Sequence, residues 1–420
     1  MSRIVITSFG SYGDVNPYLG LALATRVRGH DPVLATSPFY RDYVQAEGIA
    51  FRPVGPDLNP NDRDLLARVM DANRGTEFLV RDLLMPGLRE AYDDLAIAVE
   101  GADLLITHPI TFAGPILAQE RGLRWASTVL SPISFFSPND LPVVPPVPWL
   151  KSIERIPLAA EAFVYLAKSA SRPWTKAVNA LRAERGLARG EHPIFEGQHS
   201  PHLVLALFSK VLGAPQRDWP ANVRITGAIP YNGPATSQQL APEIEDFLKA
   251  GPAPIVFTLG SAAVGVAGRF YEESAEAARR LGARAVLLVG SHEANRLAVA
   301  PSADVLVVDH APHASLMPRA SVNVHQGGVG TLQQALRAAR PMLVVPFAHD
   351  QPDNAYRVER LGVARTLSPR RYTAGRAVDE LERLLGDVAY TQRASEVGAV
   401  VRAEDGATAA CDAIEELLRR

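Results

Sequence analysis

Hydrophobic and polar positions follow two alternating patterns along most of the chain. Short apolar runs at 4–8, 103–107 and 125–129 have the length of buried strands, whereas 19–28 repeats its apolar residues with a helical period. Strands that alternate with helices predict a parallel sheet with helices on both faces. We therefore expect an α/β fold of doubly wound, Rossmann-like units, whose ligands bind beyond the carboxyl ends of the strands.

Two interruptions of this pattern suggest how the chain is organised. Six prolines between 131 and 149 exclude regular structure there, and the Gly- and Pro-rich stretch 213–234 is typical of a linker. A chain of 420 residues also exceeds one ordinary core. We predict two similar domains with an active site in the cleft between them. The predicted parts are a first domain at 1–215, a linker at 216–235, a second domain at 236–395, and a C-terminal helix at 396–420 that packs back on the first domain.

The composition is that of a soluble globular protein. Hydrophobic residues make up 47% of the chain and charged residues 21%. The net charge of −2 does not indicate binding to nucleic acid or to a membrane surface. Cys411 is the only cysteine, so neither a disulfide framework nor a cysteine metal site is expected. Without a signal-peptide pattern or an apolar run of roughly 18 residues, we expect a cytoplasmic protein with no integral membrane contact.

The segment 325–331, His-Gln-Gly-Gly-Val-Gly-Thr, is the most informative part of the chain. It joins a predicted strand at 321–324 to a predicted helix at 331–339. Glycines at such a junction let the backbone approach a ligand, and the first N–H groups of the helix favour an anion. The sequence therefore predicts a phosphate site whose backbone is supplied by three glycines, Gly327, Gly328 and Gly330.

Four side chains around this segment are candidates for ligand contacts. His325 is placed to hydrogen-bond a phosphate oxygen, with a buried histidine that satisfies the loop as the alternative. Thr331 suits a helix cap, a phosphate ligand, or both. Asp350 and Gln351 follow the next predicted strand to the same sheet edge, where they suit hydroxyl groups or cap the following helix.

The first half contributes a candidate base. The turn 10–17, Gly-Ser-Tyr-Gly-Asp-Val-Asn-Pro, links the first strand to the first helix and places Asp14 at the sheet edge. A carboxylate there can take a proton from a hydroxyl, or it can simply cap the helix.

The turn lacks the Gly-x-Gly-x-x-Gly spacing, and the second strand ends in Ala35-Thr36-Ser37 without an acid, which disfavours a nicotinamide cofactor. Asp62-Arg63-Asp64 mimics an Asp-x-Asp metal motif, but helix capping explains it better.

Taken together, these motifs resemble family 1 glycosyltransferases of the GT-B fold over essentially the whole chain. The segment 325–331 with Asp350-Gln351 is similar to their nucleotide-sugar signature. The turn 10–17 resembles the branch of sterol glucosyltransferases, glycopeptide glycosyltransferases and the rhamnolipid rhamnosyltransferase. In that branch an Asp stands where plant members carry a catalytic His.

The resemblance assigns roles to individual residues. It implies that Asp14 is the base, that His325 and the glycine-turn amides contact a diphosphate, and that Asp350 and Gln351 bind sugar hydroxyls. Three further donor contacts are implied: Ser261 with phosphate or sugar, His310 in place of the plant Trp that stacks on uracil, and Gln333 in place of the plant Glu that binds ribose. Taken alone, His310 is equally a surface loop residue.

The acceptor side is defined less sharply. The apolar, Pro-rich region 131–175 is the expected acceptor wall, although ordinary core packing explains each of its residues equally well. The matching place for the plant partner Asp is 107–111, which contains no Asp, and an Asp base is expected to need none. The candidate acceptor contacts are Tyr12, His108, Phe135, Phe136 and Trp149.

The sequence thus predicts an inverting glycosyltransferase that moves a hexose from a nucleotide-diphosphate sugar to a hydroxyl of a hydrophobic natural product. UDP-glucose is the favoured donor, and a dTDP-deoxysugar stays open, as does the acceptor. Neither a cofactor nor a metal is expected, and the protein should be a monomer or weak dimer without a nucleic-acid partner. The alternatives are a nucleotide-sugar 2-epimerase, which would act without an acceptor, and a non-catalytic nucleotide-sugar binder.

Overall fold

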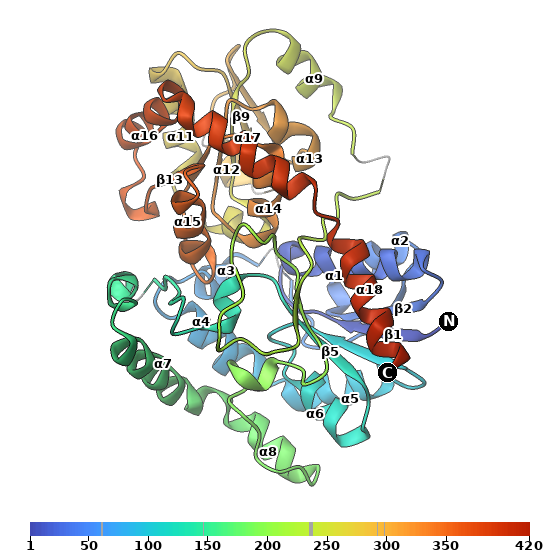
Figure 1. Ribbon diagram of the computed structural model, residues 1–420. Helices are drawn as coiled ribbons and strands as arrows, with labels where there is room; N and C mark the ends of the chain where they lie inside the picture. Colours follow the sequence, from blue (N-terminus) through green and yellow to red (C-terminus); the bar gives the residue numbers. More distant parts are fainter. Residues whose placement is uncertain (60–61, 146, 235–237, 292, 298) are drawn as a thin grey trace. The chain divides into compact units, whose positions relative to one another are not determined.

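The protein divides into two compact units in a computed structural model (Figure 1) that describes residues 1–59, 62–145, 147–234, 238–291, 293–297 and 299–420. The first unit comprises Met1–Pro60, Asn73–Tyr231 and Glu404–Arg420, and the second comprises Asn61–Ala72 and Asn232–Ala403. Residues 235–237, where the predicted linker meets the predicted second domain, lie outside the described residues. Both units have the predicted α/β architecture.

The sheet of the first unit is parallel throughout its described pairings, in the order β3-β2-β1-β4-β5-β6-β7. β1 lies between β2 and β4, so the strand order reverses beside β1, and ligands bind at such a switch point. The strands are β1 (Arg3–Thr7), β2 (Asp31–Thr36), β3 (Ala50–Pro53), β4 (Leu104–Thr107), β5 (Trp125–Val129), β6 (Val204–Ala206) and β7 (Val223–Ile225).

Helices cover this sheet and bury its apolar side chains. The core joins β1, β2 and β4 to α5 and α6 through residues such as Val5, Leu105 and Ile116. The helices are α1 (Tyr12–Val27), η1 (Pro38–Tyr40), α2 (Arg41–Ala46), α4 (Gly75–Glu77), the π-helix η2 (Phe78–Leu84), α5 (Leu88–Ala98), α6 (Ala113–Arg121), η3 (Pro132–Phe135), η4 (Pro148–Ile153), α7 (Pro157–Ser171), η5 (Arg172–Thr175), α8 (Lys176–Glu184), η6 (Glu196–Gln198) and α18 (Gly406–Arg419).

The second unit repeats this plan with the strand order β10-β9-β8-β11-β12-β13. Here the order reverses between β8 and β11. The strands are β8 (Ile255–Thr258), β9 (Ala285–Leu288), β10 (Val305–Val308), β11 (Val322–His325), β12 (Met342–Val344) and β13 (Ala364–Thr366). The helices are α3 (Arg63–Val69), α9 (Pro242–Lys249), α10 (Gly260–Ala263), η8 (Val264–Val266), α11 (Phe270–Arg280), α12 (Glu293–Leu297), α13 (His313–Leu316), η9 (Met317–Arg319), α14 (Val329–Ala338), α15 (Gln351–Arg360), η10 (Pro369–Arg371), α16 (Ala374–Gly386) and α17 (Val388–Arg402).

The structure departs from the predicted elements in two places. β7 lies inside the predicted linker and pairs with β6 at the sheet edge, where its three residues are partly or fully exposed and carry no apolar run. The helical pattern at 65–81 is divided among α3, α4 and η2, and Met70 packs in the core of the second unit. Among the described residues, no helix combines the length and apolar character that crossing a membrane requires.

The C-terminal helix α18 belongs to the first unit, where it lies beside α1 (Figure 1). An ion pair of 2.6 Å joins Arg28 at the end of α1 to Asp412, and the Arg124 guanidinium donates to the carbonyl of Leu418. The helix is therefore part of the packing around the first sheet.

Candidate functional site

Asp14 lies in the first turn of α1, directly beyond the carboxyl end of β1. Its Oδ2 accepts from the Ser11 amide at 2.8 Å and from the Ser11 hydroxyl at 3.0 Å, which completes a capping box at the start of α1. Gly10 has a φ of +133°, and a Cβ there would overlap the Asp14 carboxylate. The predicted cap is therefore present, yet Oδ1 stays outside it and the side chain is 34% exposed.

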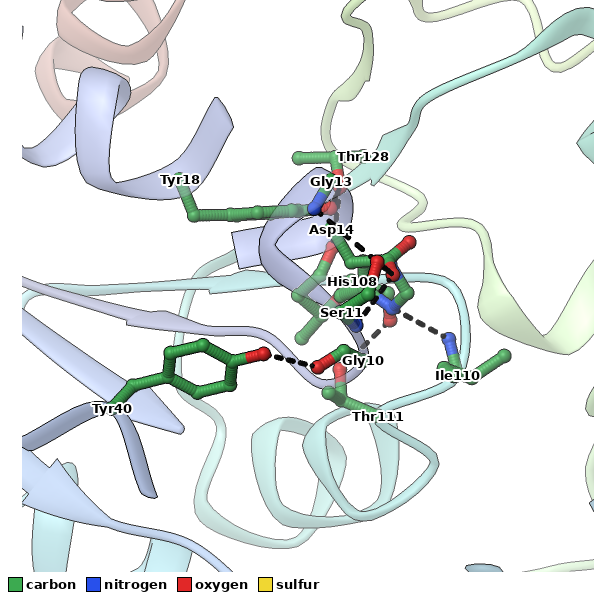
Figure 2. Close-up of polar contacts among 11 residues, drawn as sticks. Gly10, Ser11, Gly13, Asp14, Tyr18, Tyr40, His108, Ile110, Thr111 and Thr128 are labelled. Atoms are coloured by element: carbon green, nitrogen blue, oxygen red, sulfur yellow. Dashed lines mark hydrogen bonds and ion pairs between the residues drawn. The ribbon is translucent and has the colours of Figure 1, made fainter. Parts of the chain in front are cut away.

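His108 lies beside this carboxylate, because β4 is the parallel neighbour of β1 and both strands end at the same edge (Figure 2). Its Nε2 is 3.8 Å from Asp14 Oδ1, and its Nδ1 accepts from the Ile110 amide at 3.3 Å. The imidazole is only 6% exposed and contacts the ring of Tyr18. The structure thus gives Asp14 a partner, which the sequence analysis did not expect, and leaves His108 little surface for an acceptor.

The electrostatics of this pair keep Asp14 ionised. Burial raises the pKa of Asp14, but the His108 imidazole 3.8 Å from Oδ1 and the two Ser11 hydrogen bonds outweigh burial and hold that pKa below its ordinary value. Asp14 is therefore an ionised carboxylate at neutral pH, which is the state that a general base requires.

The other predicted acceptor residues lie in separate surroundings. Tyr12 is partly exposed and packs edge-on against Tyr40 at 5.1 Å, beside the Asp14 turn. Phe135 stacks on Trp219 at 3.9 Å, and Phe136 packs edge-on against Phe195 at 5.0 Å, so both rings take part in local packing. Trp149 is 58% exposed.

In the second unit, the turn after β11 has the backbone of an anion site. Gly327 has a φ of +83°, and a Cβ there would lie 2.8 Å from Val344 Cγ1. Gly328 is the N-cap of α14 and makes no side-chain cap hydrogen bond, and a helix start of this kind favours an anion. Gly330 lies in the first turn of α14 and is partly exposed. The turn therefore joins a glycine of positive φ to a helix start without a side-chain cap, and its contact with a phosphate stays a prediction.

Gln326 connects this turn to the loop after β8, across the switch point of the second sheet. Its Nε2 lies 3.4 Å from the Thr331 hydroxyl, and a Cβ on Gly260 would overlap that nitrogen. Ser261, the residue after Gly260, is partly buried at the start of α10. The two loops predicted to hold the donor thus lie together. Gln326, which the sequence analysis did not single out, is the residue that contacts both loops.

Asn354 joins the glycine turn to Asp350. This fully buried side chain donates from Nδ2 to the carbonyl of Gly327 at 2.9 Å and to the Asp350 carboxylate at 2.7 Å. The Gln351 side-chain oxygen Oε1 accepts from the Phe347 amide at 2.8 Å. The two parts of the predicted motif therefore meet at one edge, where Asp350 is partly exposed and Gln351 is buried. Asn354 lies one helical turn after Asp350, which is the spacing that could have identified it.

His325 occupies a different position from the one expected. Its ring is fully buried, Nδ1 accepts from the Gly327 amide at 3.0 Å, and Nε2 lies 3.3 Å from the Met342 sulfur. Burial, with a smaller contribution from His313, lowers the pKa of His325 to about 3. A neutral ring without exposed surface organises the turn from beneath, in contrast to the expected contact between imidazole and phosphate.

This burial predicts that stability falls in mild acid. Because His325 stays neutral when folded but has an ordinary pKa when unfolded, the unfolded chain binds the extra proton as pH falls below about 6.5. The free energy of unfolding should therefore drop by about 2 kcal/mol between about pH 7 and pH 5 for this one group. Urea unfolding at both pH values should show a smaller drop in His325→Asn, which keeps an acceptor for Gly327 but does not titrate. Equal drops in both proteins would contradict this assignment.

The remaining donor candidates differ in exposure. His310 is exposed after β10, so its ring has a free face, and burial of part of the ring lowers its pKa. Gln333 on α14 is buried, and neither polar atom of its amide has a hydrogen-bond partner among the described residues. Unpartnered buried amides are costly, so Gln333 is suited to a ligand hydroxyl. Within the described parts of the chain, no group of three His, Cys, Asp or Glu residues is arranged to hold a metal ion.

Comparison with known proteins identifies the family of this chain. Residues 273–417 match the family described as the erythromycin biosynthesis protein CIII-like C-terminal domain. The chain is 32% identical to O-mycaminosyltylonolide 6-deoxyallosyltransferase of Streptomyces fradiae, over 99% of this chain and 97% of the relative.

Solved structures share the fold at lower identity. The spinosyn forosaminyltransferase SpnP matches with a TM-score of 0.72 and 21% identity, over 100% of both chains. The glycosyltransferase VinC in complex with dTDP matches with a TM-score of 0.69 and 20% identity, again over 100% of both chains.

Proposed function

Because this chain belongs to the family 1 glycosyltransferases, in the bacterial natural-product branch with the GT-B fold, we propose that it transfers a deoxyhexose from a dTDP-sugar to a hydroxyl of a hydrophobic natural product. One observation carries the donor half of this proposal. The uncapped N-terminus of α14 is tied through Asn354 to Asp350, so an anion site adjoins a carboxylate suited to sugar hydroxyls.

The choice of dTDP revises the UDP-glucose that the sequence favoured. The S. fradiae relative is named for a 6-deoxysugar, and VinC binds dTDP. The unpartnered amide of Gln333 supports the same choice. The amide has one acceptor oxygen where the carboxylate of the resembling plant enzymes has two, and deoxyribose lacks the 2′-hydroxyl that a second oxygen would bind.

The proposed reaction uses Asp14 as the base. Its Oδ1 takes the proton of the acceptor hydroxyl, the acceptor oxygen bonds to the anomeric carbon, and the bond from that carbon to the diphosphate oxygen breaks. The displacement inverts the anomeric centre. The departing diphosphate keeps the electron pair, and the amides at the start of α14 stabilise its charge without a metal ion.

The proposed acceptor is a hydrophobic natural product. The relative from S. fradiae is named for a glycosylated tylonolide, which supports an acceptor of that chemical class. Beside Asp14, Tyr12 offers a partly exposed ring that belongs to a cluster with Phe39, Tyr40 and Tyr43. Aromatic rings of this kind contribute apolar contact area together with a polar edge.

Calorimetry with nucleotides tests the donor. We expect dTDP to bind at least about tenfold more tightly than UDP, a difference of about 1.4 kcal/mol.

Incubation with a dTDP-deoxysugar and a macrolide aglycone, followed by mass spectrometry, should then show a glycoside, with or without EDTA. Equal affinity for UDP would contradict the dTDP assignment. An altered sugar nucleotide formed without an acceptor would favour the 2-epimerase alternative.

A further inference from the structure

The contact between Asp14 and His108 also indicates what the residue beside the base does during the reaction. Asp14 follows β1 and His108 follows β4, and because these strands are parallel neighbours, His108 Nε2 lies 3.8 Å from Asp14 Oδ1. Either of these two groups could accept the proton of the acceptor hydroxyl. The hydrogen bonds of the imidazole and of the carboxylate indicate which one does.

The tautomer of His108 is fixed by its neighbours. Nδ1 accepts from the Ile110 amide at 3.3 Å, and Thr111 donates to the His108 carbonyl at 2.8 Å, which holds the loop that presents this amide (Figure 2). A neutral imidazole that accepts at Nδ1 carries its proton on Nε2. That Nε2–H faces Asp14 Oδ1, so neither ring nitrogen has a lone pair available for an acceptor proton.

The position of the ring is equally fixed. Tyr18 packs against the imidazole with ring centroids 5.5 Å apart, and its hydroxyl contacts the Thr128 hydroxyl, which in turn donates to the Thr107 carbonyl at 2.9 Å. All three side chains are buried. The imidazole is therefore held between α1 and the strand ends, while Asp14 is the member of the pair with exposed surface.

We propose that His108 is the positioning partner of Asp14: its Nε2–H stays in place during the reaction and keeps the Asp14 carboxylate ionised after the acceptor has covered it. This inference rests on the proposed function. The acceptor proton moves to Asp14 Oδ1, the acceptor oxygen attacks the anomeric carbon, and the diphosphate leaves with the electron pair. His108 neither gains nor loses a proton in this step.

A covered carboxylate needs such a partner. Asp14 is 34% exposed before an acceptor binds, and excluding that water favours the neutral acid. Without a nearby N–H, Asp14 would take a proton from solvent and lose its ability to accept one from the acceptor. The remaining titratable groups that act on Asp14 are Tyr18 and Tyr40, whose pKa values burial raises, so they stay neutral from acid to mildly basic pH.

The test compares His108→Gln with His108→Leu. Glutamine places its Nε2 near that of the imidazole and retains a donor, whereas leucine fills the space beside Tyr18 without one. We expect the acid limb of the kcat–pH profile, which reports Asp14 in the substrate complex, to move upward by about one pH unit in His108→Leu and by much less in His108→Gln. Binding of dTDP, measured by calorimetry, should be unchanged in both.

A readout independent of transfer separates this inference from the proposed function. Carbon NMR of the Asp14 carboxyl, assigned through Asp14→Asn, should show a higher pKa for Asp14 in His108→Leu than in the wild type and in His108→Gln. An unchanged Asp14 titration in His108→Leu, or equal effects of both substitutions, would overturn the partner role. Activity lost in His108→Gln but retained in Asp14→Asn would overturn it as well, because His108 would then be the base. A protein that shows the NMR shift but forms no glycoside would instead refute the proposed function.

Discussion

Replacing Asp14 with asparagine is expected to lower kcat by about 10²–10⁴-fold. The amide can still accept from the Ser11 amide and so preserve the start of α1, but it cannot take a proton from an acceptor hydroxyl. The loss should appear in kcat at saturating donor and acceptor, with the affinity for dTDP within about twofold of the wild type. Steady-state assays with product detection by mass spectrometry provide the rates.

Asp62→Asn is the matched control for this change. Like Asp14, Asp62 accepts from backbone amides at the start of a helix: it is the N-cap of α3, and its carboxylate accepts from the amides of Asp64 at 3.0 Å and Leu65 at 3.1 Å. The substitution should cost at most about 1 kcal/mol of stability and leave kcat nearly unchanged. An Asp14→Asn enzyme that keeps more than about a tenth of wild-type kcat would refute Asp14 as the base. A large loss in Asp62→Asn would revive the Asp-x-Asp interpretation.

Replacing Gly327 with alanine is expected to disrupt the donor site, with a loss of at least about 100-fold in dTDP affinity, or about 2.7 kcal/mol. The residue has a φ of +83°, and the new methyl group would lie 2.8 Å from Val344 Cγ1 and 3.3 Å from the Gln351 carbonyl. Relief of these contacts must move the turn away from β12 and α15, and with it the amides that we propose bind the diphosphate. Calorimetry with dTDP and thermal unfolding measure the two consequences.

Gly282→Ala separates backbone strain from this displacement. Gly282 has a similarly positive φ of +59°, in the same unit, but a Cβ there would meet nothing within 4 Å. Its substitution should cost about 1–2 kcal/mol of stability and leave dTDP binding intact. If both variants bind dTDP equally well, the glycine turn does not hold the diphosphate.

Much of the fold follows from local patterns. β4 and β5 lie within the predicted strands at 103–107 and 125–129, and every residue of both is buried, as is expected for strands inside a parallel sheet that is covered on both faces. β7 was missed since an exposed edge strand needs no such run. The assignment of 62–72 to the second unit depends on contacts such as that of α3 with η8, which are distant in sequence and leave no periodic trace.

For the candidate site, residue types were predictable and their partners were not. The glycine turn could be recognised in the sequence because few residues other than glycine tolerate its backbone, as Gly327 shows. The pairing of Asp14 with His108 required knowing that β1 and β4 are neighbours, which the order of elements alone does not reveal. The burial of His325 likewise depends on Met342 from the next strand.

The first unit is assembled from three separate stretches of the chain, which restricts how donor specificity can be exchanged between relatives. A single crossover near residue 231 would import a foreign α18 to pack on the resident α1, and it would leave the resident α3 against a foreign η8. A working hybrid must therefore transplant 232–403 together with 62–72 and retain 404–420. The second unit therefore cannot be exchanged as one C-terminal segment, and recombination at a single point near residue 231 should yield poorly folded hybrids.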